Sequence, residues 1–281
     1  MKKILVLLLS VFIVFPGYTQ KKNKKSPEKC ILRVASYNIW VNATSWPDRR
    51  DAVSSLVRFH DFDIFGTQEG TKPMLDDINR AGGYAYIGEG RDGGVKGEFS
   101  AIFYKTDRFD VLDNGNFWYS ETPEVPGKGW DAVCCNRICS WGKFRDKVSG
   151  REFYFFNSHY DHQGKKARVE SSKLLLLKIK EIAANYPIFA TGDYNATPES
   201  ESIRILLDDG LLKDSYTLSK QPPYGTVGTF QGLKVDAEMK TRIDFIFVTD
   251  HVNILKYGVL NDRPYGRCPS DHDPVMIVAE F

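Results

Sequence analysis

Cysteine is scarce in this sequence. Its 281 residues contain five cysteines, and no two pairs of them have the CxxC spacing of a zinc site. A structural zinc centre is therefore not expected. One or two disulfides remain open if the protein is exported, although an odd number of cysteines leaves at least one thiol unpaired. The sequence predicts no particular pairing among Cys30, Cys134, Cys135, Cys139 and Cys268.

Signatures of covalent catalysis are also lacking. The sequence has no GxSxG motif, which would place a serine nucleophile on a strand-to-helix turn, and no cysteine stands next to a histidine. Water is therefore the nucleophile expected of any hydrolytic reaction.

Long apolar runs are absent except for a short one at the start. Met1-Lys2-Lys3 and the apolar stretch Ile4 to Pro16 have the pattern of a secretory signal peptide, and the stretch is too short to span a bilayer comfortably. We expect residues 1–19 to be removed and the protein to be exported to the periplasm or the extracellular space. A retained membrane anchor is the alternative. No cysteine follows the run directly, which argues against a lipoprotein.

A strong excess of positive charge is missing too. The formal charge of +2 falls to 0 without Lys2 and Lys3. Residues 20–29 form a lysine-rich leader, expected to be disordered, which carries +4, so the rest of the chain carries about −4. The sequence therefore does not indicate a basic groove for polyanions, although a bound divalent cation would offset part of this negative charge.

Apolar periodicity predicts one αβ sandwich over residues 30–281, with no internal repeat and no second-domain linker. We expect strands at 31–40, 63–67, 84–90, 99–104, 109–116, 132–146, 151–158, 186–190, 242–249 and 275–281. Helices are predicted at 47–60, 73–80, 163–185 and 197–210, the third with Val169, Leu174, Leu175, Ile179 and Ile182 facing inward. Residues 218–232 are predicted to form a surface loop over a cleft.

Several predicted strands end in acidic, amide or imidazole residues. These residues are Asn38, Glu69, His159, Asp193, Asn195, Asp244, Asp271 and His272. Asp193 and Asn195 are two apart, so in an extended chain both side chains would point to the same side. Because buried carboxylates are costly unless they are paired or bind a metal, their convergence predicts a cation site at one end of the sandwich.

Seven motifs occur in the order found in one known family. They are SYNIW at Ser36, TQEG at Thr67, the strand with Glu98, NSHYDH at Asn157, GDYN at Gly192, RIDFIF at Arg242 and SDHDP at Ser270. The sequence resembles the endonuclease/exonuclease/phosphatase superfamily over residues 30–281, and is closest in pattern to the deadenylase and nocturnin group and to small secreted bacterial members. The resemblance implies a four-layer αββα sandwich in which two mixed sheets pack face to face.

The resemblance also implies a metal-dependent phosphoester hydrolase. Glu69 would ligate a divalent cation, usually Mg²⁺, with Mn²⁺ or Ca²⁺ as alternatives, and Asn38 and Asp271 would lie beside it. Asp193 and Asn195 would bind or orient the attacking water and the phosphate. These roles agree with the chemistry, because a hard cation prefers oxygen ligands and neutralises phosphate oxygens.

The remaining implied roles concern histidines and their partners. His272, fixed by Asp244, would activate water or stabilise the phosphorane. His159 would contact the scissile phosphate or the leaving group, with Glu98 holding its ring. Arg137 would neutralise the phosphate. A histidine oriented by a carboxylate typically contributes about a hundredfold to ten-thousandfold to the rate.

The substrate is left open by the sequence. A phosphorylated small molecule, a lipid headgroup and nucleic acid are all compatible, and a secreted endonuclease or 3′-5′ exonuclease is the close alternative. Asp161 and His162 match an HxDH pattern whose role is structural or catalytic, and Asp273 is assigned none. Six loop aromatic residues are candidates for stacking a base or a sugar, or for anchoring the loops: Trp118, Tyr119, Trp130, Tyr216, Tyr224 and Phe230.

A catalytically silent module that binds phosphorylated ligands is the remote alternative. The complete set of polar residues at the strand ends argues against it. No obligate protein partner is evident, and we expect a monomer.

Overall fold

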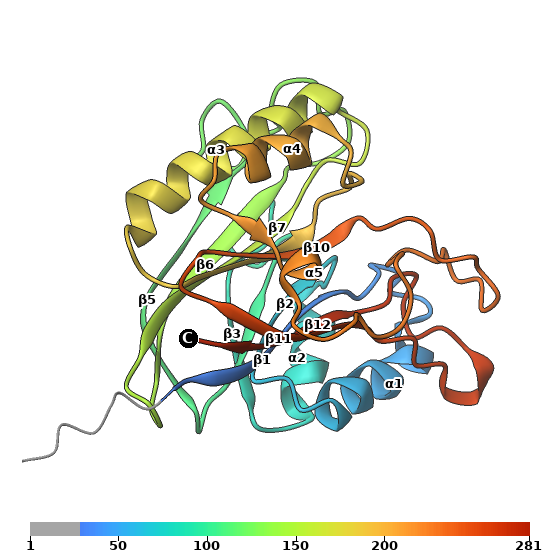
Figure 1. Ribbon diagram of the computed structural model, residues 1–281. Coiled ribbons are helices and arrows are strands. Elements are labelled where there is room, and N and C mark those ends of the chain that lie inside the picture. The colour runs from blue at the N-terminus through green and yellow to red at the C-terminus, as the bar shows by residue number, and fades with distance from the viewer. Residues whose placement is uncertain (1–28) are drawn as a thin grey trace, which may run out of the picture.

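A computed structural model describes residues 29–281 (Figure 1). The predicted signal peptide and all of the lysine-rich leader except Lys29 lie outside the described residues. Lys29 forms an ion pair with Glu280 of the last strand.

The first sheet has six strands and contains both the first and the last strand of the described chain. Their order across the sheet is β11 (Asn253–Val259), β12 (Val275–Glu280), β1 (Ile31–Asn38), β2 (Ile64–Gln68), β4 (Ile102–Lys105) and β3 (Tyr84–Ile87). β1 pairs antiparallel with β12 and parallel with β2. Because β1 and β2 are parallel and in register, Asn38 lies opposite Gln68, so that both strands end at the same edge of the sheet.

The second sheet also has six strands. Their order is β5 (Phe109–Trp118), β6 (Ile138–Asp146), β7 (Glu152–His159), β8 (Ile188–Asp193), β10 (Asp244–Val248) and β9 (Lys213–Asp214). The parallel pair β7 and β8 places His159 opposite Asp193, and antiparallel β10 places Asp244 opposite Asp193. Three candidate site residues are thereby neighbours in one row of the sheet.

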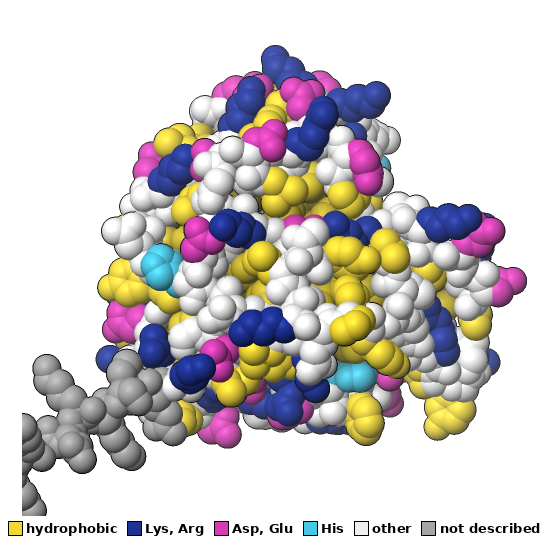
Figure 2. Space-filling model, viewed as in Figure 1, with side chains coloured by type: hydrophobic (Ala, Val, Ile, Leu, Met, Phe, Trp, Pro, Cys, Tyr) yellow, Lys and Arg dark blue, Asp and Glu magenta, His cyan; other side chains and the backbone are white. Residues whose placement is uncertain are grey.

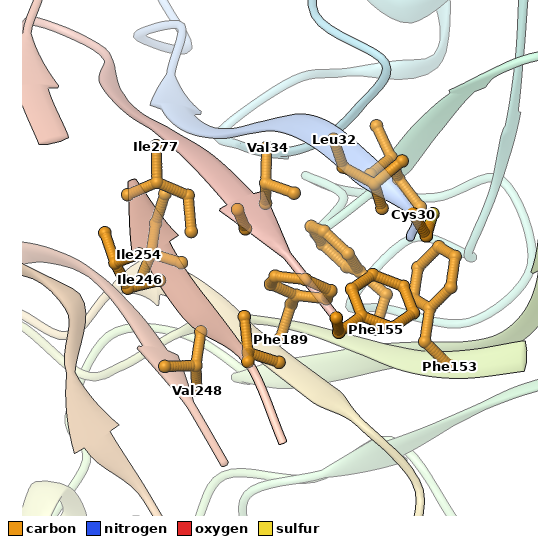
Figure 3. Packing of buried hydrophobic residues seen from close by; sticks show 14 of the residues in the cluster. Cys30, Leu32, Val34, Phe153, Phe155, Phe189, Ile246, Val248, Ile254 and Ile277 are labelled. Carbon is orange, nitrogen blue, oxygen red and sulfur yellow. The ribbon is translucent and has the colours of Figure 1, made fainter. Parts of the chain in front are cut away.

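The sheets pack face to face around an apolar core. Leu32 and Val34 of β1 face Phe153, Phe155 and Phe189 of the other sheet, as Figure 3 shows. All five side chains are buried, and burying an aliphatic or aromatic side chain typically stabilises the fold by about 1.5–3 kcal/mol.

Helices cover the outer faces of the two sheets. The helices α1 (Trp46–Phe59) and α2 (Lys72–Arg80) lie on one side in Figure 1, whereas α3 (Lys165–Ala183) and α4 (Glu201–Asp208) lie on the other. A short helix, α5 (Ser215–Leu218), and a 3₁₀ turn, Pro264–Gly266, complete the elements of the described chain. The predicted four-layer αββα sandwich is thus confirmed. No helix within residues 29–281 is long and apolar enough to cross a membrane.

Several predicted boundaries were wrong. The strand expected from residue 132 begins only at Ile138, because residues 132–137 form a loop. Strand β11 was missed, since a register shift between Ile254 and Lys256 interrupts its alternation of apolar and polar residues. Of the inward candidates in α3, Leu175 and Ile179 are buried, whereas Val169 is only half-buried.

Candidate active site

Six of the eight predicted strand-end residues line one cleft of about 570 Å³, and the other two, Asn38 and Asp244, lie behind it in hydrogen-bond contact with residues of the lining. Its polar lining residues are Glu69, Arg91, Glu98, Arg137, His159, His162, Asp193, Asn195, Asp271 and His272. Residues of both sheets meet here. The cleft therefore exists only where the two sheets are docked.

Asn38 links the carboxylates of the two sheets. Its Nδ2 donates to Glu69 Oε1 at 2.9 Å and to Asp193 Oδ2 at 3.0 Å, and its Oδ1 accepts from the backbone N–H of Trp40. The amide oxygen of Asn38 is thus engaged by the backbone. Asn38 thereby orients two of the acids, and its predicted place beside the cation stays a prediction.

The acidic residues fit a cation site. Burial, together with the charge of Asp244, raises the pKa of Asp193, and burial raises the pKa of Asp271. Oxygen and nitrogen atoms of Glu69, His159 and Asp193 lie within 4.8 Å of one another. A divalent cation would relieve the repulsion among these acids, and carboxylates are the donors that Mg²⁺ prefers. Asp271 lines the same cleft but is not one of this close group, and its predicted place beside the cation stays a prediction.

A buried carboxylate fixes the imidazole of His272. Asp244 Oδ2 lies 2.8 Å from His272 Nδ1 and accepts a 2.6 Å hydrogen bond from Thr229 Oγ1. Burial alone would lower the pKa of His272, but the charges of Asp244 and two further acids outweigh it and raise the pKa to about 10. The predicted pairing of His272 with Asp244 is present.

An arginine lies against the second imidazole. Arg137 Nη1 is 3.2 Å from His159 Nδ1 and 3.1 Å from its Nε2. Arg137 also contacts Asp161 at 3.4 Å and His162 Nδ1 at 2.7 Å. Burial, reinforced by the charge of Arg137, holds the pKa of His159 well below its usual range, so that its ring is neutral. Asp161 accepts from the backbone N–H groups of residues 163 and 164, which gives it a structural role.

Glu98 does not hold the ring of His159 as predicted. Its carboxylate pairs with Arg91 at 2.7 Å, and burial raises the pKa of Glu98 to about 7 despite this arginine. The competing cation decides the outcome, because a guanidinium attracts a carboxylate more strongly than a neutral imidazole does. Arg91 is therefore a cleft residue that the prediction did not include.

Asp193 and Asn195 both line the cleft, although not for the predicted reason. β8 ends at Asp193, and Asn195 has a left-handed backbone with a φ of +47°. Asn195 is held by two hydrogen bonds, from its N–H to Asp193 Oδ1 and from its Nδ2 to the carbonyl oxygen of Tyr160. A tight turn, and not an extended chain, thus places the two side chains together.

Of the six candidate aromatic residues, Phe230 lines the cleft. It is 39% exposed, and its ring packs edge-on against His272 with a centroid distance of 5.0 Å. Trp118 and Tyr119 are buried, and Trp130 and Tyr216 pack against the apolar core. For these four residues the structure favours the anchoring alternative.

A buried polar network supports the cleft from below. Asn157 donates to the carbonyl oxygens of Thr67 and Ala101 and accepts from Gln68 Nε2 and Thr191 Oγ1. The bonds with Thr67, Ala101 and Gln68 join the two sheets, whereas the bond from Thr191 lies within the second sheet.

Sequence reasoning missed Arg91, Thr229 and the role of Asn157. Arg91 lies in a glycine-rich loop without periodicity. Thr229 belongs to the Gly228-Thr229-Phe230 string before RIDFIF, and Asn157 opens the NSHYDH motif. The position of each residue within a sequence motif could therefore have indicated its role.

The adjacent Cys134 and Cys135 form a disulfide, whereas Cys30, Cys139 and Cys268 are free thiols. Burial raises the pKa of the Cys30 and Cys139 thiols to about 12. Neither is therefore a candidate nucleophile.

A two-sheet αβ sandwich with paired carboxylates and imidazoles at its strand ends defines a class of metal-assisted phosphoesterases and nucleases. The chain belongs to the endonuclease/exonuclease/phosphatase family, whose model matches residues 35–272. The family predicted from the sequence motifs is thus confirmed.

Comparison with known proteins gives similar relatives. A mannosyl-6-phosphatase from Bacteroides thetaiotaomicron is 46% identical, with a TM-score of 0.84, and the match covers 89% of this chain and all of that one. An endonuclease/exonuclease/phosphatase family protein from the same species is 45% identical, with a TM-score of 0.85, over 90% of this chain and 99% of that one. The CCR4-Not complex 3′-5′-exoribonuclease subunit Ccr4 of Aspergillus oryzae is 23% identical over 85% of this chain, which spans 44% of that protein's length.

Proposed function

We propose that this protein is an exported, divalent-metal-dependent phosphomonoesterase that acts on a small phosphorylated molecule, with a sugar phosphate as the first candidate. One observation carries the proposal. One cleft brings carboxylates suited to a cation together with arginines suited to phosphate oxygens.

Glu69 and Asp193, with His159 nearby, would hold the cation, and the raised pKa values of Asp193 and Asp271 fit that role. When bound, a divalent cation would neutralise phosphate oxygens and favour a nucleophilic hydroxide. Mg²⁺ is our first choice, with Mn²⁺ and Ca²⁺ as alternatives.

The residues of the chain supply the remaining functions. Asp244 keeps the proton on His272 Nδ1, so that Nε2 faces the cleft and can exchange a proton with water or the leaving group. The three carboxylates around His272 stabilise its charged form, which suits it to oppose negative charge on phosphate. Arg137 is a further cation within hydrogen-bonding distance of neutral His159.

Three features support a small phosphomonoester. The cleft volume falls in the range of small-molecule sites. Two arginines, Arg91 and Arg137, suit the double negative charge of a terminal phosphate. The 46% identical relative is a mannosyl-6-phosphatase. Lys, Arg, Asp and Glu side chains are interspersed over the face seen in Figure 2, which offers no basic stripe for a polyanion.

Export is proposed from the pattern of residues 1–19 and fits the disulfide in the described chain. Expression of the full chain, followed by fractionation and sequencing of the mature N-terminus, tests it. A protein that retains Met1 in the cytoplasm would contradict it.

The decisive experiment measures hydrolysis by residues 20–281 with Mg²⁺, Mn²⁺, Ca²⁺ or chelator. Mannose 6-phosphate, bis-p-nitrophenyl phosphate, sphingomyelin, and single-stranded DNA and RNA form the panel, and His272→Ala is the inactive control. We expect metal-dependent release of phosphate from the sugar phosphate, abolished in the variant. Folded protein without turnover would support the silent binding module.

A nuclease is the second candidate, favoured by Phe230 at the cleft mouth and by the similarity to Ccr4. Turnover of the oligonucleotides without turnover of mannose 6-phosphate would establish it and reject the phosphomonoesterase.

A further inference from the structure

The disulfide between Cys134 and Cys135 lines the same cleft as the site residues. It lies in the loop between β5 and β6, and Arg137 follows two residues later. Cys134 is exposed and Cys135 is half-buried. The disulfide is thus part of the cleft surface that a bound ligand can contact.

The loop is anchored on both sides of the disulfide. Upstream, the Asp131 carboxylate accepts from the backbone N–H groups of Lys166 and Ala167 in the first turn of α3. Downstream, Asn136 Nδ2 donates to Asp92 at 3.0 Å. Residues 132–135 between these anchors form no helix or strand. A covalent ring across two neighbouring residues therefore fixes the part of the loop that backbone pairing leaves unconstrained.

The lining of the cleft separates into two kinds of surface. Carboxylates, imidazoles and arginines suit the phosphoryl group, whereas Val41, Phe230, Ile243 and the two cysteines supply apolar atoms. When the phosphate is bound by the polar groups, this second set is available to its organic substituent. Disulfide sulfurs are polarizable and have no proton to donate, so they suit the C–H face of a sugar ring better than a pair of thiols does.

We propose that the Cys134–Cys135 disulfide is a specificity-determining element that contacts the organic group of the substrate. This inference rests on the proposed function, because it assumes that the cleft binds an organic phosphate. Its consequence is that reduction weakens the binding of the organic part while the binding of the phosphate itself is kept.

The test compares two ligands that differ in the organic group. Calorimetry measures the Kd of mannose 6-phosphate and of inorganic phosphate for His272→Ala, which permits binding without turnover. Both are measured with Mg²⁺, before and after tris(2-carboxyethyl)phosphine, which cleaves the S–S bond to two thiols and becomes its phosphine oxide. The double variant C134S/C135S in the same background repeats the comparison without reductant. C268S is the matched control, since Cys268 does not line this cleft.

We expect the Kd of mannose 6-phosphate to rise at least fivefold on reduction and in the double variant, and the Kd of inorganic phosphate to change less than twofold. Thiol titration of the unfolded, unreduced protein should find three thiols. Five thiols, equal losses for both ligands, or no loss for either would overturn the inference. If neither ligand binds the oxidised variant and the wild type releases no phosphate from mannose 6-phosphate, the proposed function fails as well. If both ligands bind and neither Kd responds to the disulfide, the inference alone is rejected.

Discussion

Replacing Asp244 by Asn tests the central pair of the cleft. The substitution keeps an oxygen that can accept from His272 Nδ1 and Thr229 Oγ1, which now lie 2.8 Å and 2.6 Å from Oδ2. It removes the negative charge that stabilises the imidazolium. The variant therefore separates charge from geometry.

The expected loss of kcat in Asp244→Asn is about a hundredfold to ten-thousandfold, as for removal of general acid–base assistance. This range corresponds to about 2.7–5.4 kcal/mol of transition-state stabilisation. Steady-state hydrolysis of bis-p-nitrophenyl phosphate or mannose 6-phosphate at saturating metal measures it. Asp63→Asn is the control, because Asp63 is a buried acid that pairs with Arg108 and does not line the cleft.

Asp244 also links stability to pH in the metal-free protein. The pKa of His272 is raised from 6.5 to about 10, so its charged form contributes stability that is complete below pH 6.5 and is lost as the pH rises through 10. Because three acids share this effect, we assign about 1–3 kcal/mol to Asp244. Thermal unfolding in chelator should show that Asp244→Asn is destabilised relative to the wild type by more at pH 6 than at pH 10. Nearly unchanged kcat, or a deficit that does not depend on pH, would refute the reasoning.

Three further predictions concern neighbouring residues. Burial raises the pKa of Glu98 to about 7, so its charged form is disfavoured in the fold and the wild type loses stability as the pH rises. The free energy of unfolding of Glu98→Gln, relative to that of the wild type, should therefore increase by about 1–3 kcal/mol from pH 5 to pH 8. Thermal unfolding in chelator measures this, and an equal difference at the two pH values would contradict it. Asn157→Ala should cost about 2–4 kcal/mol in urea unfolding, because four buried hydrogen bonds are lost, three of which join the two sheets. A cost below 1 kcal/mol would argue against this network. Phe230→Ala should raise KM about fivefold with kcat within twofold, and a main effect on kcat would instead show that Phe230 supports His272.

The sequence predicted the architecture well, because strands with a buried face carry a clear apolar pattern and end at polar residues. It failed where that pattern is interrupted, as in β11, whose bulge breaks the alternation. The loop before Ile138 was read as a strand because residues 132–135 are apolar, although two of them, Cys134 and Cys135, line the cleft and none lies in a sheet.

The composition of the candidate site was predictable, as was the pairing of His272 with Asp244, but other contacts within the site were not. Residues at strand ends, such as His159 and Asp193, are brought together by the register of parallel strands. The partner of Glu98 could not be found in this way, because Arg91 approaches it from a loop. The hydrogen bonds of Asn38 were also beyond sequence reasoning, since an amide can present either its oxygen or its nitrogen.

The pairing of β1 with β12 has a consequence for biosynthesis. Ser36, near the end of the first strand, lies opposite Val275 of the last, and His272 comes just before that strand. A nascent chain can therefore neither complete the first sheet nor assemble the His272–Asp244 pair until residues 272–280 are available. For a chain that crosses a membrane before it folds, this order would keep the enzyme inactive during translation and transport.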